Sequence, residues 1–570
     1  MTDVKKKIAL HFFLISVKIP QQQKGKVMQQ TPKQIQSEQR SMMWSMILII
    51  AVLFGFQYFT RPTPQEDVKP EEVEEAFEQP EIVTKTVASS ARHVAIENDT
   101  ISGKIALNGG VFDNVTLKKY KQTIEENSPD VELLSDKYIA YLKWTGSGLF
   151  PSETADWRVS GDKLTSETPV TFSWQGNGLV LTRQISVDDN YMFTIVDTLK
   201  NTGLKPVSVA LNGIVGRATD NVIPERTSVH TGFVSLIDNR LEETDYHDVA
   251  KEEVHYQTKG GWTGMTDKYW QTIFVPDQGQ VVEYIDKQVD DMYFATFQTA
   301  PQKVMSGASV TKTTRLFVGA KDLNLINAYQ KALDIPKFDL TIDFGWFYFL
   351  TKPFLYFLQW LYALVGNMGI AILVFATLLR LALLPIATKS YVSMAKMKKV
   401  QPQMKILQER YKDDRMRLQQ EIMALYKREK VNPAGGCLPM FIQIPVFFAL
   451  YKVLSVSLQM RQAPFFGWIK DLSAADPSSV FTLFGLIPWP IPSFLNLGVM
   501  PILMGLTMYI QQRLTPQPAG TDKTQANMFK YMPIIFTFMM GQFAVGLIIY
   551  WTWSNILSIA QQKYIMKKVG

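Results

Sequence analysis

Five long stretches of the chain contain no charged residue. They are Ser41–Thr60, Pro353–Leu379, Val431–Tyr451, Pro477–Gln512 and Tyr531–Gln562. Because an α-helix rises 1.5 Å per residue, about 20 apolar residues cross the hydrocarbon core of a bilayer. Each stretch therefore predicts at least one membrane span, and the last is long enough for two spans that turn at Gly541-Gln542-Phe543.

The two spans within the last stretch would contain about 15 residues each, and a helix of that size is about 22–24 Å long. This is less than a hydrocarbon core of about 30 Å. Since a bilayer thins around a span that is too short for it, the pattern predicts that the chain thins the surrounding membrane.

Between the first two apolar stretches, hydrophobic and polar residues alternate with a period of two. Val180–Val187 and Met192–Leu199 show this alternation, and Asp188-Asp189-Asn190 separates them. Alternation interrupted by Asn, Asp and Gly is typical of antiparallel strands in a sandwich or barrel. We therefore predict a large all-β domain, which a Pro- and Glu-rich linker joins to the first span.

Three aromatic residues of this domain, Trp262, Tyr269 and Trp270, lie close together in the sequence. They could line a groove for a sugar or a peptide. Packing in the core of the sandwich is the other interpretation, because aromatic side chains dominate such cores.

Basic residues beside the apolar stretches predict the topology. Eight lysines and arginines precede the first span, the loop from Lys389 to Lys430 is rich in both, and Lys563, Lys567 and Lys568 lie near the end of the chain. The positive-inside rule places all three clusters in the cytoplasm. Six spans satisfy this condition, whereas five would leave the last lysines outside. We thus expect both termini in the cytoplasm and the all-β domain on the outer side.

The composition argues against several kinds of site. Cys437 is the only cysteine, so neither an intrachain disulfide nor a cysteine metal cluster is possible. His93, His230, His247 and His255 lack the spacing of metal ligands, and there is no glycine-rich phosphate loop. No predicted span contains the Asp or Glu that ion-coupled transporters usually carry. A membrane-anchored carbohydrate enzyme would need a paired acid and base, and the sequence does not locate one.

One charged residue, Arg380, interrupts the apolar segment Met368–Ile386. A guanidinium inside a spanning helix costs at least about 2.5 kcal/mol, so it usually has a function, a partner or a wet cavity. Alternatively, Arg380 extends toward the cytoplasmic headgroups, because Lys389 follows only nine residues later. The segment alone leaves both interpretations open.

Two further segments show helical patterns outside the spans. Tyr391–Tyr411 and Met416–Arg428 predict a basic helical hairpin in the cytoplasm. Such a hairpin could bind ribosomal RNA, anionic lipid or a partner protein, or its lysines could serve only to enforce topology. The aromatic segment Trp346–Leu364 suits a helix in the outer interface, or the start of the second span.

These features, and several short motifs, resemble the YidC/Oxa/Alb family of membrane protein insertases. The most specific match is the continuous run Glu421–Leu450 (EIMALYKREKVNPAGGCLPMFIQIPVFFAL). Further matches are Ser393–Lys396, Gln401-Pro402, Arg461–Pro464, Asp471–Pro477 and Ser554-Asn555 in the membrane part, with looser ones at Ile101–Tyr120 and Gly260–Pro276 in the external domain. The resemblance covers nearly the whole chain beyond residue 28.

The resemblance implies a multi-pass α-helical membrane protein of six spans, five of which form an insertase core, with a large external all-β supersandwich domain of galactose-mutarotase type. It also implies a hydrophilic groove within the membrane. The groove and substrate residues carried over are Arg380, Gln443, Thr377, Ser554, Asn555, Ile444, Phe447, Tyr550 and Trp551. The sequence departs from the family pattern twice. The groove threonine falls on Ala376, with Thr377 adjacent, and Trp551 stands where a tyrosine is common.

The expected organisation follows from these patterns. It comprises a cytoplasmic arm (1–41), a first transmembrane signal anchor (42–60), a linker (61–90), a periplasmic β-supersandwich (91–335), an interfacial amphipathic helix (336–366), a second transmembrane helix (367–387), a cytoplasmic hairpin (388–436), a third transmembrane helix (437–459), a periplasmic loop (460–493), a fourth transmembrane helix (494–512), a cytoplasmic loop (513–528), the fifth and sixth transmembrane helices (529–562) and a basic tail (563–570).

The function that the resemblance implies is insertion and folding of inner-membrane proteins, alone or with the Sec translocon. The alternative is a membrane-embedded folding chaperone without independent insertase activity. Expected partners are nascent inner-membrane proteins, the Sec translocon, membrane lipids and the ribosome, the last through the hairpin and the basic tail. We expect a protein of the cell inner membrane that is not an enzyme and that uses no cofactor, metal or DNA.

Overall fold

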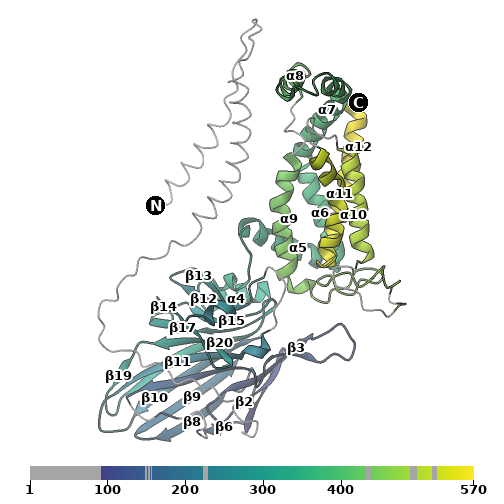
Figure 1. Cartoon of the computed structure of the whole chain (residues 1–570). Helices are drawn as coiled ribbons and strands as arrows, with labels where there is room; N and C mark the ends of the chain where they lie inside the picture. Colours follow the sequence, from purple (N-terminus) through teal and green to yellow (C-terminus); the bar gives the residue numbers. More distant parts are fainter. Residues whose placement is uncertain are drawn as a thin grey trace. The chain divides into compact units, whose positions relative to one another are not determined.

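The computed structural model describes residues 92–569, except 148–149, 152–154, 156, 223–228, 432–437, 485, 488–496 and 516–522. The predicted arm, signal anchor and linker, and also Cys437, therefore lie outside the described residues. With the exception of residues 413–421, the described chain belongs to one compact unit. It contains a β-rich part followed by a helical part (Figure 1).

The β-rich part consists of two mainly antiparallel sheets. The first sheet runs in the order β14 (Val254–Lys259), β17 (Val281–Val289), β18 (Met292–Thr299), β11 (Val207–Ala218), β5 (Tyr138–Gly146), β3 (Phe112–Lys121), β2 (Ile101–Ala106), β1 (His93–Glu97) and β7 (Lys163–Leu164), with β19 (Gln302–Val304) beside β11 and β4 (Asp130–Leu134) beside β3. The second runs in the order β13 (Arg240–Asp245), β12 (Gly232–Ile237), β15 (Trp262–Thr266), β16 (Trp270–Val275), β20 (Ser309–Ala320), β10 (Met192–Asn201), β9 (Leu179–Val187), β8 (Val170–Gly176) and β6 (Arg158–Ser160).

The inner faces of the two sheets pack against each other through aromatic and paired polar side chains. Phe112 of β3 meets Phe193 of β10 edge to face, with 5.0 Å between ring centroids. The indole of Trp144 on β5 donates to Asp197 on β10 (2.8 Å), and Asp197 also pairs with the buried Arg183 of β9. Both charges of this ion pair are buried, and each is satisfied by the other.

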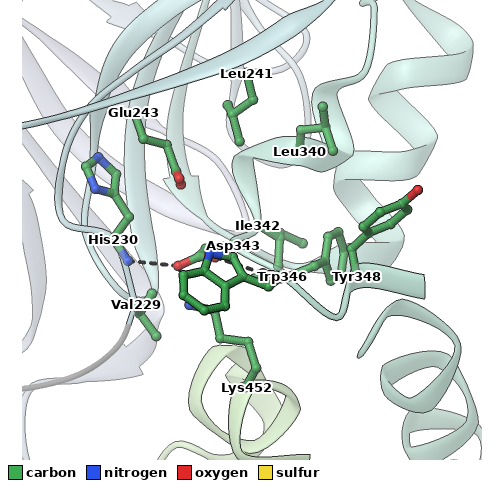
Figure 2. A pocket seen from close by; sticks show the side chains of 12 residues that line it. Val229, His230, Leu241, Glu243, Leu340, Ile342, Asp343, Trp346, Tyr348 and Lys452 are labelled. Atoms are coloured by element: carbon green, nitrogen blue, oxygen red, sulfur yellow. Dashed lines mark hydrogen bonds and ion pairs between the residues drawn. The ribbon is translucent and has the colours of Figure 1, made fainter. Parts of the chain in front are cut away.

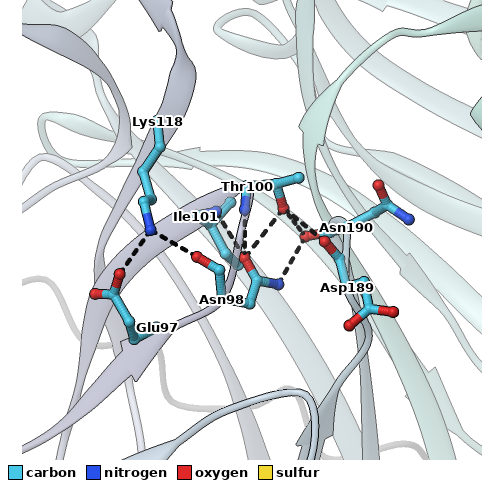
Figure 3. Close-up of polar contacts among 7 residues, drawn as sticks. All are labelled: Glu97, Asn98, Thr100, Ile101, Lys118, Asp189 and Asn190. Carbon is cyan, nitrogen blue, oxygen red and sulfur yellow. Dashed lines mark hydrogen bonds and ion pairs between the residues drawn. The ribbon is translucent and has the colours of Figure 1, made fainter.

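The predicted all-β domain is confirmed, including the strand pair on either side of the 188–190 turn. Side chains from the loop between β1 and β2 also bind this turn. Asn98, in the loop between β1 and β2, donates to the backbone oxygen of Asp188 (2.7 Å). It also donates to the backbone oxygen of Asn190 (3.1 Å), and Thr100 donates to the same oxygen at 2.6 Å (Figure 3). These contacts join the ends of the two sheets.

The aromatic cluster that the sequence left open belongs to the packed interior. Trp262 is fully buried and its indole donates to the Pro336 carbonyl (2.9 Å), while Tyr269 is 9% exposed. Trp270 is half-buried, and its ring lies against Tyr120. Core packing is therefore the role that the structure gives to this cluster.

The helical part follows the β-rich part. Two helices, α3 (Tyr246–Val249) and α4 (Leu323–Ala332), belong to the β-rich part. The others are α5 (Tyr348–Val365), α6 (Met368–Ala382), α7 (Leu384–Arg410), α8 (Arg415–Arg428), α9 (Leu438–Val456), α10 (Val499–Leu514), α11 (Lys523–Met540) and α12 (Val545–Val569). No single helix in the described residues has both the length and the apolar composition of a span, but α6 and α7 together do, with a 66° bend between them.

That bend corrects one expectation. The segment Met368–Ile386 is not one continuous helix, because α6 ends at Ala382 and α7 begins at Leu384. Pro385 occupies the first turn of α7, where its missing N–H is not needed. In a continuous helix, the proline ring would clash with the preceding turn. The chain therefore turns two residues after Arg380.

The last two helices correct a second expectation. They are separated at residues 541–544, where the sequence predicts the turn, but α11 has 18 residues and α12 has 25. Polar residues at the ends of the apolar stretch continue both helices, so neither is limited to about 15 residues. Because mismatch with the bilayer depends on the apolar length of a span and not on the full length of its helix, the thinned bilayer stays a prediction.

A fully buried acid, Asp286 on β17, supplies a test of this fold. Burial raises the pKa of its carboxyl to about 8, and its Oδ1 has no hydrogen-bond partner among the described residues. Because the unfolded chain releases this proton near pH 4, it binds fewer protons than the folded state up to about pH 8. The folded state therefore loses stability as the pH rises through this window.

We expect Asp286→Asn to stabilise the protein at pH 7 by up to about 4 kcal/mol and to have little effect near pH 4. Thermal unfolding of the purified protein, followed by circular dichroism at both pH values, measures this difference. Asp162→Asn, at an exposed position, is the control. An equal change in stability at both pH values would show that Asp286 does not titrate as described.

Candidate functional site

The candidate site begins with Arg380, near the C-terminal end of α6. Its half-buried guanidinium reaches α12, where the Ser554 hydroxyl accepts from both Nε (3.0 Å) and Nη2 (2.8 Å). Ser554 itself is only 2% exposed. Sequence neighbours could not reveal this pair, because 174 positions separate its two members.

The partner of Arg380 is neutral. Within the described part of the chain, no Asp or Glu forms an ion pair with Arg380. A guanidinium has five N–H donors, and two of these point to the Ser554 hydroxyl. The positive charge of the site is therefore held in place by a hydroxyl but is not neutralised by it.

A second polar contact lies one turn away on α12. The Gln443 side chain of α9 donates to the hydroxyl of Tyr550 (3.1 Å), and Tyr550 is 2% exposed. Residues four apart share one face of a helix, so Tyr550 and Ser554 follow each other on the same face of α12. This helix thus joins the Gln443 contact of α9 to the Arg380 contact of α6.

Aromatic rings extend the contact between α9 and α12. Phe447 and Trp551 meet edge to face, with 4.6 Å between centroids, and Trp551 also contacts Phe536 of α11 at 5.9 Å. Edge-to-face pairs at this separation are favourable. Ile444, on the same helix as Phe447, remains 44% exposed.

The structure also shows where the hydroxyl of Thr377 lies, next to the position at which the family pattern has a groove threonine. Ala376 is buried, while the adjacent Thr377 hydroxyl donates to the Leu373 carbonyl (2.8 Å) and accepts from the Trp553 indole (2.9 Å). The hydroxyl is therefore shifted by one residue along α6 and contacts α12. Trp553 was not among the predicted residues.

Most of the predicted site residues are thus brought together between α6, α9 and α12. Asn555 is placed differently, because its side chain turns toward α10 and donates to Thr507 (3.1 Å). Both Thr507 and Trp553 escaped the sequence analysis. Trp553 lies inside the polar and aromatic run from 550 to 555, and that run is the one signal that could have indicated it.

Comparison with known proteins assigns the chain to a family. The family model described as "60Kd inner membrane protein" matches residues 360–570, and the model "YidC periplasmic domain" matches residues 93–357. A curated relative from Methylobacterium radiotolerans, named "Membrane protein insertase YidC", is 47% identical over 501 residues, which is 84% of this chain and 81% of the relative. The chain belongs to the YidC family of membrane protein insertases.

A second curated relative in the YidC family also matches most of the chain. The relative from Rickettsia bellii, with the same printed name, is 43% identical over 550 residues, or 92% of this chain and 98% of the relative. A solved structure titled "Active YidC insertase crystal structure with the first transmembrane domain resolved" covers 83% of this chain and 93% of its own, at 18% identity and a TM-score of 0.36. The two family models make the chain an inner-membrane protein whose β-rich part is the periplasmic domain of the YidC family.

The Arg380–Ser554 contact can be tested in this insertase. We expect Ser554→Ala to cost about 1–2 kcal/mol, because it removes the acceptor of two charged hydrogen bonds. Its control is Ser558→Ala, one turn further on α12, where the buried hydroxyl bonds only its own helix at the Ser554 carbonyl (2.7 Å). Melting temperatures of the purified variants measure the effect. If both variants melted alike, the Arg380 contact would not stabilise the helical part.

Proposed function

We propose that Arg380 captures the acidic, hydrophilic end of an incoming membrane protein in a hydrated groove between α6, α9 and α12. The observation that carries this proposal is the half-buried guanidinium whose partner is the hydroxyl of Ser554. A carboxylate from outside the protein can approach such a cation, because no acidic partner among the described residues competes for it.

The magnitudes are consistent with capture followed by release. At about 4 Å and an effective dielectric constant near 20, the attraction between an arginine and a carboxylate is about 4 kcal/mol. This is comparable with the cost of at least about 2.5 kcal/mol for placing the arginine within a span. The attraction is therefore strong enough to select an acidic tail and too weak to retain it permanently.

The apolar segment of the substrate would then move along α9 and α12 into the lipid. Ile444, Phe447 and Trp551 supply the aromatic and aliphatic surface for this step, and the buried Tyr550 positions Gln443 beside them. Gln443, Thr377 and Ser554 supply the hydrogen-bonding groups that keep the groove polar. Transfer of the segment into lipid is driven by burial of its apolar surface, at about 25 cal/mol per Å². No covalent step or nucleotide enters this mechanism, so the proposed activity is not enzymatic.

The proposed topology has six spans, with both termini in the cytoplasm and the β-rich domain in the periplasm. The basic segments of α7 and α8 then face the cytoplasm, where Arg428 of α8 donates to Gln403 of α7 (3.0 Å). Nascent inner-membrane proteins and lipids are the expected partners of the groove. The ribosome would meet α7, α8 and the basic tail, and the Sec translocon would act beside the insertase on some substrates.

A folding chaperone without independent insertase activity is the second candidate. Aromatic residues on α5 and just before it support this candidate, because Trp346, Tyr348, Phe349 and Trp360 are more than half exposed. They could shelter a substrate already in the lipid. Insertion into vesicles that contain this protein and no Sec translocon distinguishes the two candidates.

Electrostatic capture predicts a substrate-dependent defect. We expect Arg380→Ala to lower insertion of a substrate with an acidic tail by about tenfold, which corresponds to about 1.4 kcal/mol of the attraction estimated above. A substrate with a neutral tail should insert almost as well as with the unmodified protein. Protease protection of the translocated tail in proteoliposomes measures both rates.

Arg380→Lys is expected to retain most of the activity, because Ser554 binds the guanidinium at one oxygen and does not require a planar fork. The control is Arg513→Ala, which removes an exposed arginine that contacts Tyr509 on α10. Equal insertion of the acidic-tail substrate by Arg380→Ala and the unmodified protein would refute capture by this charge.

A further inference from the structure

The outer end of α9 is joined to the β-rich domain by a nearly buried ion pair. The ammonium of Lys452 on α9 contacts the carboxylate of Asp343, which lies in the segment between the β-rich domain and α5. Their side chains are only 11% and 13% exposed, respectively. Removing one partner would leave the other charge buried without compensation.

Asp343 also holds the chain around it. Its Oδ2 accepts from the backbone N–H of His230 (2.9 Å), just before β12, and its Oδ1 accepts from the backbone N–H of Gly345 (3.0 Å) (Figure 2). One carboxylate therefore connects the periplasmic sheet, the approach to α5 and the helix α9.

The pair also lies at the edge of a cavity. A cavity of about 560 Å³ adjoins the pair, and its lining includes Glu243, Trp346 and Tyr348 (Figure 2). A side chain beside an open cavity is not held by close packing on that side. The ion pair and its hydrogen bonds, together with the stem of Lys452 lying over Gly345, therefore contribute to the position of α9 against the domain.

A second contact lies just beyond the end of α9. Arg461 donates to the backbone oxygen of Gln122 (3.2 Å) and Gln462 to that of Lys121 (3.0 Å), both at the end of β3. The guanidinium of Arg461 also lies over the ring of Trp270, 5.2 Å from its centroid. The chain is therefore attached to the periplasmic domain both before and after the point where α9 ends.

The same helix carries part of the proposed groove. Phe447 precedes Lys452 by five residues, or about 7.5 Å along a helix, and Gln443 precedes it by nine residues, or about 13 Å. We propose that the Asp343–Lys452 ion pair is a positioning contact for insertion, which sets α9 so that Gln443 and Phe447 meet Tyr550 and Trp551 on α12. Arg461 is its second attachment. This inference rests on the proposed function of that face of α9.

Charge reversal tests the contact in the full-length protein. We expect Asp343→Lys and Lys452→Asp each to lower insertion by about tenfold, because each places like charges together in a nearly buried site. The double variant restores opposite charges but leaves the backbone N–H groups of His230 and Gly345 without their acceptor, so it should insert several-fold faster than either single variant without reaching the unmodified rate. Lys470→Asp is the matched control, since it makes the same change at an exposed lysine of the following loop.

Two readouts separate this role from the capture role of Arg380 and from simple misfolding. The reversed variants should lower insertion of acidic-tail and neutral-tail substrates by the same factor, whereas loss of Arg380 affects only the former. In a Cys437→Ser background, spin labels at Phe441 on α9 and at the exposed Leu204 of the β-rich domain report the position of α9. Each single reversal should shift or broaden the distance between the labels, and the double variant should restore it.

If a single reversal prevents folding, Asp343→Asn and Lys452→Met provide milder versions of the same comparison. Unchanged label distances and unchanged insertion in a single reversal would overturn the proposal. A well-folded double variant that inserts no faster than the single variants would overturn it as well. An effect confined to acidic-tail substrates would assign Lys452 to substrate capture, and thereby also contradict a positioning role.

Discussion

The site depends on a positive charge that is oriented by a hydroxyl and not cancelled by an acid. Two hydrogen bonds to the hydroxyl oxygen of Ser554 orient the Arg380 guanidinium. They do not neutralise its positive charge. Such a group cannot be sealed in a dry apolar interior, because the desolvation penalty of an uncompensated charge is several kcal/mol. The helices around it must therefore leave it access to water or to a ligand of opposite charge.

This requirement explains the chemistry of the neighbouring helices. α12 presents Tyr550 and Ser554 on one face, so that α9 and α6 each find a neutral polar partner on it. The bend after Ala382 follows only two residues beyond the arginine, and it separates the apolar helix α6 from the basic helix α7. The arginine therefore lies close to the place where the chain changes from an apolar to a basic environment.

The sequence predicts those features that depend on local patterns. Alternation of residue types locates β9 and β10, and the charge inside an apolar segment identifies Arg380 as unusual. The partner of Arg380 is 174 residues away, and that of Lys452 is 109 residues away, so neither pair leaves a local signal. The resemblance to a family supplied Ser554, but Trp553 and Thr507 depend on how α12 is rotated against α6 and α10. The lengths of α11 and α12 were not predictable in the same way, because charge-free stretches mark apolar segments and not the ends of helices.

Two buried cations of the molecule are held differently from Arg380. Arg183 in the sandwich and Lys452 at the end of α9 are both paired with a carboxylate within the chain. Pairing of this kind fixes position, because each partner would be costly to bury alone. Arg380 has only a hydroxyl, which fixes its direction and leaves its charge available. This contrast with Arg183 and Lys452 supports the proposal that the charge of Arg380 serves a partner that arrives from outside.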